Sequence, residues 1–138
     1  MTPARARALV GAAGAVAAVC VVLGLAMAGG PGEARREQRD ATRLSDLREI
    51  ANAFVCHGEA AAAAEPADLA GLSPACLWPA RAEALRDPSS GAAYRIQRAD
   101  RLVRVCGEFE GAAARRDQGF PPFDPATGCV TVTYPDPA

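Results

Sequence analysis

The sequence predicts an α+β fold: an N-terminal transmembrane helix, then an amphipathic helix packed on a small antiparallel sheet of about three strands. Three observations predict it. The span from Leu9 to Ala28 carries no charge, apolar residues then recur at spacings of three and four, and after Gly91 the apolar period changes to two. Helical segments followed by strand segments are typical of α+β domains.

Composition argues against several classes of protein. The 138 residues carry a formal net charge of -1, and the 15 basic residues are all arginine. A balanced charge argues against a dedicated nucleic-acid-binding protein. The chain is 22% charged with almost no net charge, which is not typical of disorder. It is also too short for two full catalytic domains.

The N-terminal region predicts a membrane anchor or an export signal. As a helix, Leu9–Ala28 would span about 30 Å, the thickness of the hydrocarbon layer. Arg5 and Arg7 precede it, so the positive-inside rule places residues 1–8 on the cytoplasmic side of a bacterial inner membrane. The residues after the span would then lie outside the cytoplasm. A cleaved signal peptide is the alternative, because Ala26-Met27-Ala28 has the pattern that signal peptidase reads. Either outcome exports the remainder.

Cys20 lies inside the apolar span. The preceding Ala17-Ala18-Val19 is a poor lipobox and further apolar residues follow, so we interpret Cys20 as an apolar thiol in a helix. A prepilin-type signal needs a glutamate five residues after the cut, and no glutamate occurs before Glu33.

A breaker cluster at residues 29–33 predicts a Gly/Pro hinge between the anchor and an exported domain over 34–134. The tail, 135–138, is expected to fray.

The domain begins with a predicted helix over 34–56. Its charged start, up to Asp40, is expected to be solvated, and Gly58 is a plausible C-terminal cap. Its second half has one apolar stripe, formed by Leu44, Leu47, Ile50, Ala51, Phe54 and Val55.

Short helical turns are expected at Pro66–Leu72 and Ala80–Asp87, followed by a turn at Asp87–Gly91.

Three strands are predicted at Tyr94–Gln97, Leu102–Phe109 and Cys129–Tyr134. Three prolines exclude a central strand from Phe120–Pro125. Leu47, Ile50 and Phe54 are expected to contact the strands, with Ile96, Val105 and Val132 as candidate partners.

Four cysteines lie beyond the anchor, an even number that favours disulfides in an exported domain. Four thiols permit three pairings; the predicted elements favour Cys56–Cys76 and Cys106–Cys129, each worth about 3 kcal/mol in the chain-entropy model. A zinc site is less well supported, since zinc ligands usually come in close pairs.

No residue set indicates a catalytic, cofactor or metal site. Cys56 and His57 are adjacent on a helix and do not face each other, and His57 suits the helix C-terminus. Glu108, Glu110, Asp117 and Asp124 match no calcium loop and are expected on the surface. Trp78, Phe120 and Phe123 are candidates for an exposed aromatic patch, although core packing is the expectation for each.

The segment Asp87-Pro88-Ser89-Ser90-Gly91-Ala92-Ala93-Tyr94-Arg95-Ile96 resembles an element of type IV pilin-like and type II secretion pseudopilin-like globular domains. Arg104–Phe109 and Thr127–Val130 resemble the strand and the final cysteine motif that follow it. The likeness, over roughly residues 40–134, is closer still to uncharacterised bacterial membrane-anchored proteins with such an extracytoplasmic domain.

Together these observations predict a single-pass, membrane-anchored extracytoplasmic domain that acts as a structural or protein-interaction module. The alternative is a minor pseudopilin-like component of a secretion or pilus apparatus. A small periplasmic enzyme is the third class, and no nucleophile–base pair supports it. The predicted partner is the membrane, through residues 9–28; the sequence indicates no nucleic acid and identifies no protein partner.

Overall fold

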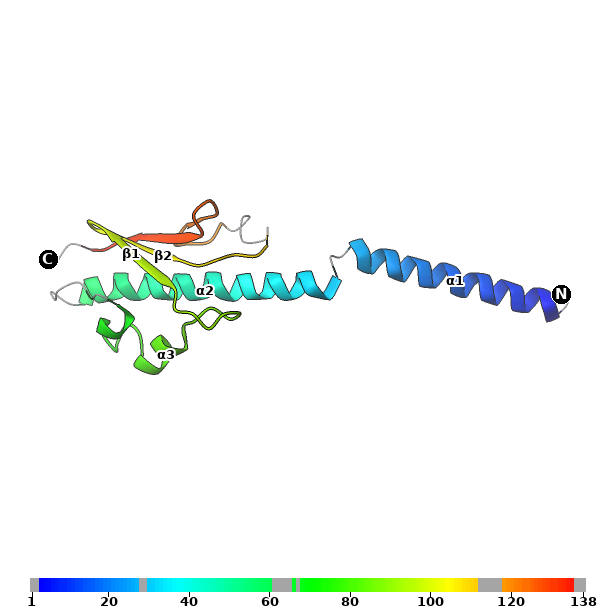
Figure 1. Ribbon diagram of the computed structural model, residues 1–138, viewed down its shortest axis with the longest axis horizontal. Coiled ribbons are helices and arrows are strands. Elements are labelled where there is room, and N and C mark those ends of the chain that lie inside the picture. Colours follow the sequence, from blue (N-terminus) through cyan, green and yellow to red (C-terminus); the bar gives the residue numbers. More distant parts are fainter. Residues whose placement is uncertain (1–2, 28–29, 61–65, 67, 112–117, 136–138) are drawn as a thin grey trace. The chain divides into compact units, whose positions relative to one another are not determined.

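The fold is α+β, as the sequence predicts. The structure is a computed structural model that describes residues 3–27, 30–60, 66, 68–111 and 118–135. Helices α1 (Pro3–Met27) and α2 (Gly30–Ala60) come first in the chain, followed by a 3-10 turn η1 (Leu69–Gly71), helix α3 (Pro79–Ala84) and four strands (Figure 1). By internal contacts the chain divides into two compact units, Met1–Arg35 and Arg36–Ala138.

After Arg5 and Arg7, helix α1 is apolar on all sides. Every side chain that the structure describes in it is exposed, including Val16 and Leu23. The described part of the chain holds one helix that is long and apolar enough to cross a membrane, with a mean hydropathy of 2.4 in its apolar part. A signal sequence near the N-terminus can meet the same criteria of length and hydropathy.

Helix α2 is longer than the predicted 34–56 at both ends. It begins within the predicted hinge, because Pro31 fits the first turn of a helix, where its missing N–H has no partner to lose. The chain enters this turn at Gly30 with a φ of 68°, a conformation that suits glycine.

Gly58 does not cap α2, contrary to the prediction. It lies inside the last turn, where an added Cβ would be 2.6 Å from Cδ of Pro135 and 3.1 Å from Cε1 of Tyr134. Only a residue without a side chain lets the chain that leaves the sheet pass this close to the helix. Pro135 is therefore packed, and the rest of the predicted tail lies outside the described residues.

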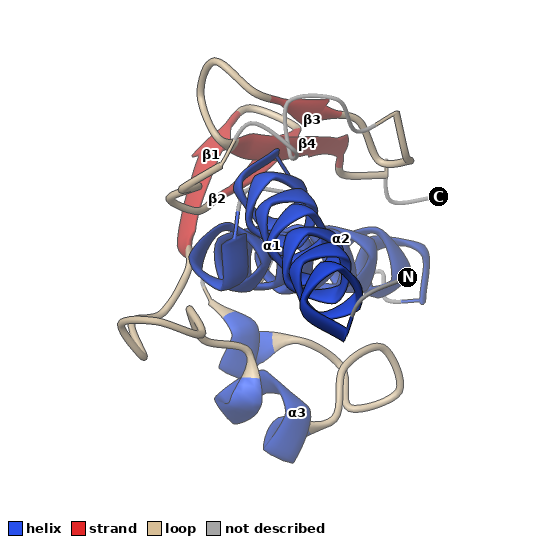
Figure 2. Ribbon diagram, turned by 90° about the vertical axis from the view of Figure 1, so that its right-hand side faces the viewer, coloured by secondary structure: helices blue, strands red, loops and turns tan. Residues whose placement is uncertain are grey.

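The sheet has four antiparallel strands in the order β1-β2-β4-β3 (Figure 2). They are β1 (Arg95–Ala99), β2 (Leu102–Cys106), β3 (Phe123–Asp124) and β4 (Cys129–Thr133). The unpredicted strand, β3, is two residues long and lies at the edge, where nearby prolines are tolerated. The exclusion of a central strand from this segment therefore holds.

One face of the sheet packs on α2. Leu47, Ile50 and Phe54 have no exposed surface. In the strand register Ile96 pairs with Val105 and Val105 with Val130, so all three point to the same face. The buried cluster also contains Val103 and Val132, which confirms the predicted stripe and its partners.

The segment between α2 and β1 packs on the other side of α2, opposite the sheet (Figures 1 and 2). Leu72, Leu77 and Leu85 extend from it into the same core. Asp68 begins η1 by accepting a hydrogen bond from Gly71 N at 3.1 Å, and Pro79 occupies the start of α3. Helix α2 is thus covered on two sides.

Candidate functional site

A cluster of charged side chains is buried at the middle of α2. Arg43 has 2% of its surface exposed. Its Nε donates to Asp87 Oδ2 at 2.5 Å, and its Nη1 donates to Asp40 Oδ1 at 2.7 Å and to Glu110 Oε1 at 2.9 Å. The positively charged guanidinium of Arg43 therefore lies at the centre of three carboxylates and forms charge-assisted hydrogen bonds with each of them.

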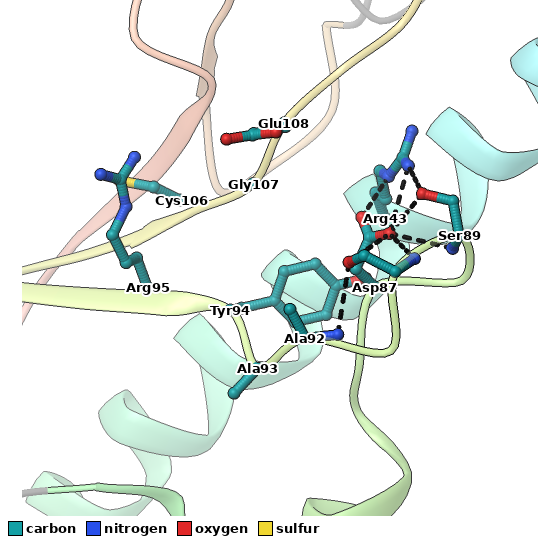
Figure 3. A pocket seen from close by; sticks show the side chains of 11 residues that line it. Arg43, Asp87, Ser89, Ala92, Ala93, Tyr94, Arg95, Cys106, Gly107 and Glu108 are labelled. Carbon is teal, nitrogen blue, oxygen red and sulfur yellow. Dashed lines mark hydrogen bonds and ion pairs between the residues drawn. The ribbon is translucent and has the colours of Figure 1, made fainter.

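The turn at Asp87 presents its carboxylate to this cluster (Figure 3). Asp87 Oδ1 accepts the backbone N–H groups of Ser89 and Ser90, each at 2.9 Å. Gly91 closes the turn, donating to Asp87 O at 2.8 Å with a φ of 68°, which glycine adopts readily. The local sequence thus builds a rigid turn. The second carboxylate oxygen of Asp87, Oδ2, accepts a hydrogen bond from Arg43.

Asp40 attaches a second loop to the helix. Its carboxylate accepts Glu110 N at 3.1 Å and Gly111 N at 2.6 Å, and 1% of its surface is exposed. The expectation that the start of the helix is solvated is therefore wrong at Asp40. The loop after β2 and the turn before β1 meet at the same point of α2.

Two carboxylates of the cluster, those of Asp87 and Glu110, are held in the ionised form by arginine. Hydrogen bonds from Arg43, above all, hold the pKa of Asp87 well below its usual range. Hydrogen bonds from Arg39, and then from Arg43, lower the pKa of Glu110 to about 2. The bond to Asp87 in turn raises the pKa of Arg43. An ionised carboxylate already paired with a guanidinium is a poor proton donor or acceptor, so the cluster is suited to joining segments.

A second set of polar contacts continues along α2. Tyr94 donates its hydroxyl to Asp46 Oδ2 at 3.0 Å. Burial raises the pKa of Asp46, although the bonds from Tyr94 and Arg81 oppose this. Burial and the neighbouring Asp46 carboxylate raise the pKa of Tyr94. Arg81 of α3 forms two bonds to Glu49, at 2.8 and 2.6 Å. The tyrosine and the arginine thereby fix β1 and α3 against one helix.

A cleft of about 330 Å³ opens beside the cluster (Figure 3). Its walls include Arg43, Tyr94, Arg95, Cys106 and Glu108. Among the residues that the structure describes, no group of three or more His, Cys, Asp or Glu side chains gathers in a way that holds a metal ion. The walls of the cleft include charged side chains of both signs, Arg43, Arg95 and Glu108.

The structure contains the disulfides Cys56–Cys76 and Cys106–Cys129, the pairing that the predicted elements favour. Cys20 is free and exposed on α1. His57 is buried, and its Nδ1 accepts Ser73 N at 2.9 Å, so it fixes the loop that carries Cys76. Sequence reasoning did not reveal this contact.

The acidic and aromatic candidates do not form a common site. Glu110 joins the cluster, whereas Asp124 accepts Ala126 N and the Thr127 hydroxyl within its own turn. Glu108 lines the cleft, and Asp117 lies outside the described residues.

The three aromatic residues considered for a patch differ in their exposure. Core packing is wrong for Trp78 and Phe120, which are 75% and 87% exposed. Phe123 is half-buried and packs on Phe109, with ring centroids 4.7 Å apart.

The sequence did not lead us to predict burial of three polar residues of α2, namely Asp40, Arg43 and Asp46. Their spacing of three was the available signal, because it extends the apolar stripe toward the helix start. Charged residues at stripe positions indicate buried ion pairs.

Comparison with protein-family models, with curated proteins and with solved structures finds no significant match.

Proposed function

We propose that this protein is a single-pass, membrane-anchored extracytoplasmic domain that serves as a structural or protein-interaction module and not as an enzyme. The observation that carries the proposal is the combination of helix α1, which is apolar after Arg7, with a separate compact unit that holds two disulfides. Disulfides persist in oxidising compartments, and α1 is long enough to span a bilayer.

In this proposal α1 crosses the bacterial inner membrane through residues 9–28, with residues 1–8 in the cytoplasm. Arg5 and Arg7 before the span support this orientation. The opposite orientation would place four disulfide-forming cysteines in a reducing compartment, which disfavours it.

A role in interaction is supported by how the polar side chains are used. In the described residues, Arg43 of α2 is bonded to Asp87, and Tyr94 is bonded to Asp46 of α2. Such a set holds loops in fixed positions and leaves no activated nucleophile.

Reporter fusions test the topology. Alkaline phosphatase fused after Ala138 should be active, because it requires an oxidising compartment to fold, whereas β-galactosidase at the same point should be inactive. An active β-galactosidase fusion with inactive phosphatase would overturn the proposal. N-terminal sequencing separates the two fates of the apolar helix, since a mature chain that starts at Gly29 would be a secreted domain without an anchor.

A minor pseudopilin-like component of a secretion or pilus apparatus is the second candidate. It is supported by a long helix that carries an antiparallel sheet, with the Asp87 turn attached to that helix through Arg43. Mechanical shearing of cells followed by high-speed sedimentation should then release part of the protein with filaments. Retention of all of it in the membrane fraction would contradict this candidate.

A further inference from the structure

The two disulfides differ in burial. Cys106 and Cys129 have 3% and 5% of their surface exposed, whereas Cys56 and Cys76 are both half-buried. Thiol–disulfide exchange requires an incoming thiolate to reach one of the two sulfur atoms, and the more exposed disulfides of proteins are the labile ones. The two bonds are therefore expected to react at different rates with the same thiol.

The backbone around the buried disulfide keeps its two cysteines together. Cys106 and Cys129 are register partners in the β2–β4 ladder, and Gly107 N donates to Gly128 O at 3.0 Å directly beyond them. If this disulfide broke, the ladder would still hold the two thiols side by side. The bond thus reinforces a pairing that the strands already make.

The backbone around the half-buried disulfide is different. Cys76 N and Leu77 N both donate to Ser73 O, at 2.9 and 3.0 Å, so these bonds close a turn within the loop and do not reach α2. The disulfide to Cys56 attaches this turn covalently to α2, with the hydrogen bond from Ser73 N to His57 Nδ1 beside it. Breaking the disulfide therefore removes the covalent attachment of the turn.

Exposed surface surrounds the loop cysteine of this pair. Ala75 is exposed, and Trp78 is 75% exposed. Cys56 instead lies on α2 next to the buried His57, so an incoming thiol reaches Cys76 more readily. Tryptophan is enriched at the centres of protein–protein contacts. Trp78 therefore offers an apolar contact to a protein that carries the thiol.

We propose that Cys56–Cys76 is a site of thiol–disulfide exchange with a protein dithiol of the C-x-x-C kind, and that Trp78 contacts this partner. A thiolate of the dithiol bonds to Sγ of Cys76, and the Cys56–Cys76 bond breaks with its electron pair leaving on Cys56, which takes a proton from water. The second thiol of the dithiol gives up its proton and displaces Cys76, which is protonated in turn. The chain gains two thiols, and the dithiol is oxidised to a disulfide.

The exchange releases the turn and leaves the sheet in place. Without its covalent attachment the turn around Cys76 opens more often, while α2 and the strands stay joined by their apolar core. This inference goes beyond the proposed anchoring and export, because it gives the folded chain two states that differ in oxidation.

The first test measures reactivity on the oxidised full chain in detergent micelles, with dithiothreitol as the probe. Rapid alkylation at successive times, followed by mass spectrometry of peptides, gives the rate at which each cysteine becomes a thiol. Cys56 and Cys76 should be labelled together, at least about tenfold faster than Cys106 and Cys129. Equal rates for the two pairs, or a faster reaction of the buried pair, would overturn the proposal.

Hydrogen exchange on the selectively reduced chain tests release of the turn. The amides of Cys76 and Leu77 should exchange at least about tenfold faster than in the oxidised chain, whereas those of β2 and β4 should keep their rates. Unchanged exchange at Cys76 and Leu77 would overturn the release.

The second test uses reduced thioredoxin as the protein dithiol, with the second cysteine of its C-x-x-C site replaced by serine so that the mixed disulfide accumulates. Peptide mapping should find this protein bonded to Cys76. A bond to Cys106 or Cys129 would overturn the site, and a bond to Cys56 would overturn the assignment of the attacked sulfur.

Two variants separate contact with the partner from reactivity of the bond. Trp78→Ala should slow reduction by unmodified thioredoxin at least about fivefold, and should change reduction by dithiothreitol less than about twofold. Phe120→Ala removes another aromatic side chain, 87% exposed, and should leave both rates unchanged. Equal slowing of both reductants by Trp78→Ala, or a Phe120→Ala effect of the same size, would overturn the contact.

Discussion

The two sides of helix α2 are covered in different ways. On the sheet side the contacts are mainly between apolar side chains, with Phe54 and four strand valines at the centre. On the side of η1 and α3, leucines also enter the core, but the segment is attached at defined points, namely Arg43–Asp87, Asp46–Tyr94, Glu49–Arg81, His57–Ser73 and Cys56–Cys76. Apolar burial determines which face is covered, whereas directional bonds determine where along the helix each loop lies.

The largest expected effect is on the sheet side. Phe54→Ala removes a side chain with no exposed surface and should lower the free energy of unfolding by about 4 kcal/mol. Denaturant unfolding of the oxidised full chain in micelles measures it. Asn52→Ala, at an exposed position of the same helix, is the control, with an expected change below about 0.5 kcal/mol. Equal effects would show that α2 is packed with a different face inward.

Arg43→Met should be the most damaging change among the polar contacts. It leaves the buried Asp40 carboxylate without its guanidinium, which costs about 3 kcal/mol. Arg35→Met, at an exposed position, is the matched control, and the same unfolding measurement applies. A change below about 0.5 kcal/mol would mean that the cluster is solvated in solution.

Asp87→Asn makes the pH dependence visible. Since the pKa of Asp87 lies below its ordinary value of 3.8 in the folded protein, the ion pair stabilises the fold fully at pH values above that of the unfolded carboxyl. The contribution is then lost as the pH falls toward the folded value. Asp87→Asn should cost about 2 kcal/mol at neutral pH, and its unfolding midpoint should decline less steeply than the wild type's below about pH 4. Parallel profiles would contradict this.

Tyr94→Phe tests a single hydrogen bond on the same side. The hydroxyl donates to Asp46, and its loss should cost about 1 kcal/mol. A double-mutant cycle with Asp46→Ala gives the coupling free energy between the two residues. Additive effects would show that the bond contributes nothing.

The smallest expected effect is at Glu49, which bonds to Arg81 of α3. Its ion pair with Arg81 joins side chains that are 35% and 45% exposed, so Glu49→Ala should cost less than about 1 kcal/mol. The cost should shrink in 1 M salt. An effect as large as that of Phe54→Ala would reverse the assignment of the two faces.

The sheet side was predictable because burial repeats with the period of the element. Leu47, Ile50 and Phe54 follow the helical spacing, and the strand valines follow a period of two. The cysteine pairs followed from the same elements. β3 escaped prediction because a two-residue edge strand has no period to detect.

The polar attachments to α2 were less predictable because no period marks them. Arg43 lies 44 residues from Asp87 and 67 from Glu110, and a charged helix residue indicates solvent until its partners are known. Trp78 is exposed, although core packing was expected for it. The Asp87 turn was recognisable from its proline, serines and glycine, but its attachment point on α2 was not.

The polar attachments on the α3 side have a consequence for how the domain opens. Hydrogen exchange reports local openings that need not involve the whole fold. The segment between Leu69 and Ala84 is attached to α2 by the ion pairs of Arg81, the hydrogen bond to His57 and the Cys56–Cys76 disulfide. Strands β2 and β4 are attached mainly through their buried valines. Added salt weakens ionic contacts, and a salting-out anion such as sulfate strengthens apolar ones. Sulfate should therefore widen the gap in exchange rate between these two regions, and η1 and α3 should be the part of the domain that breathes first.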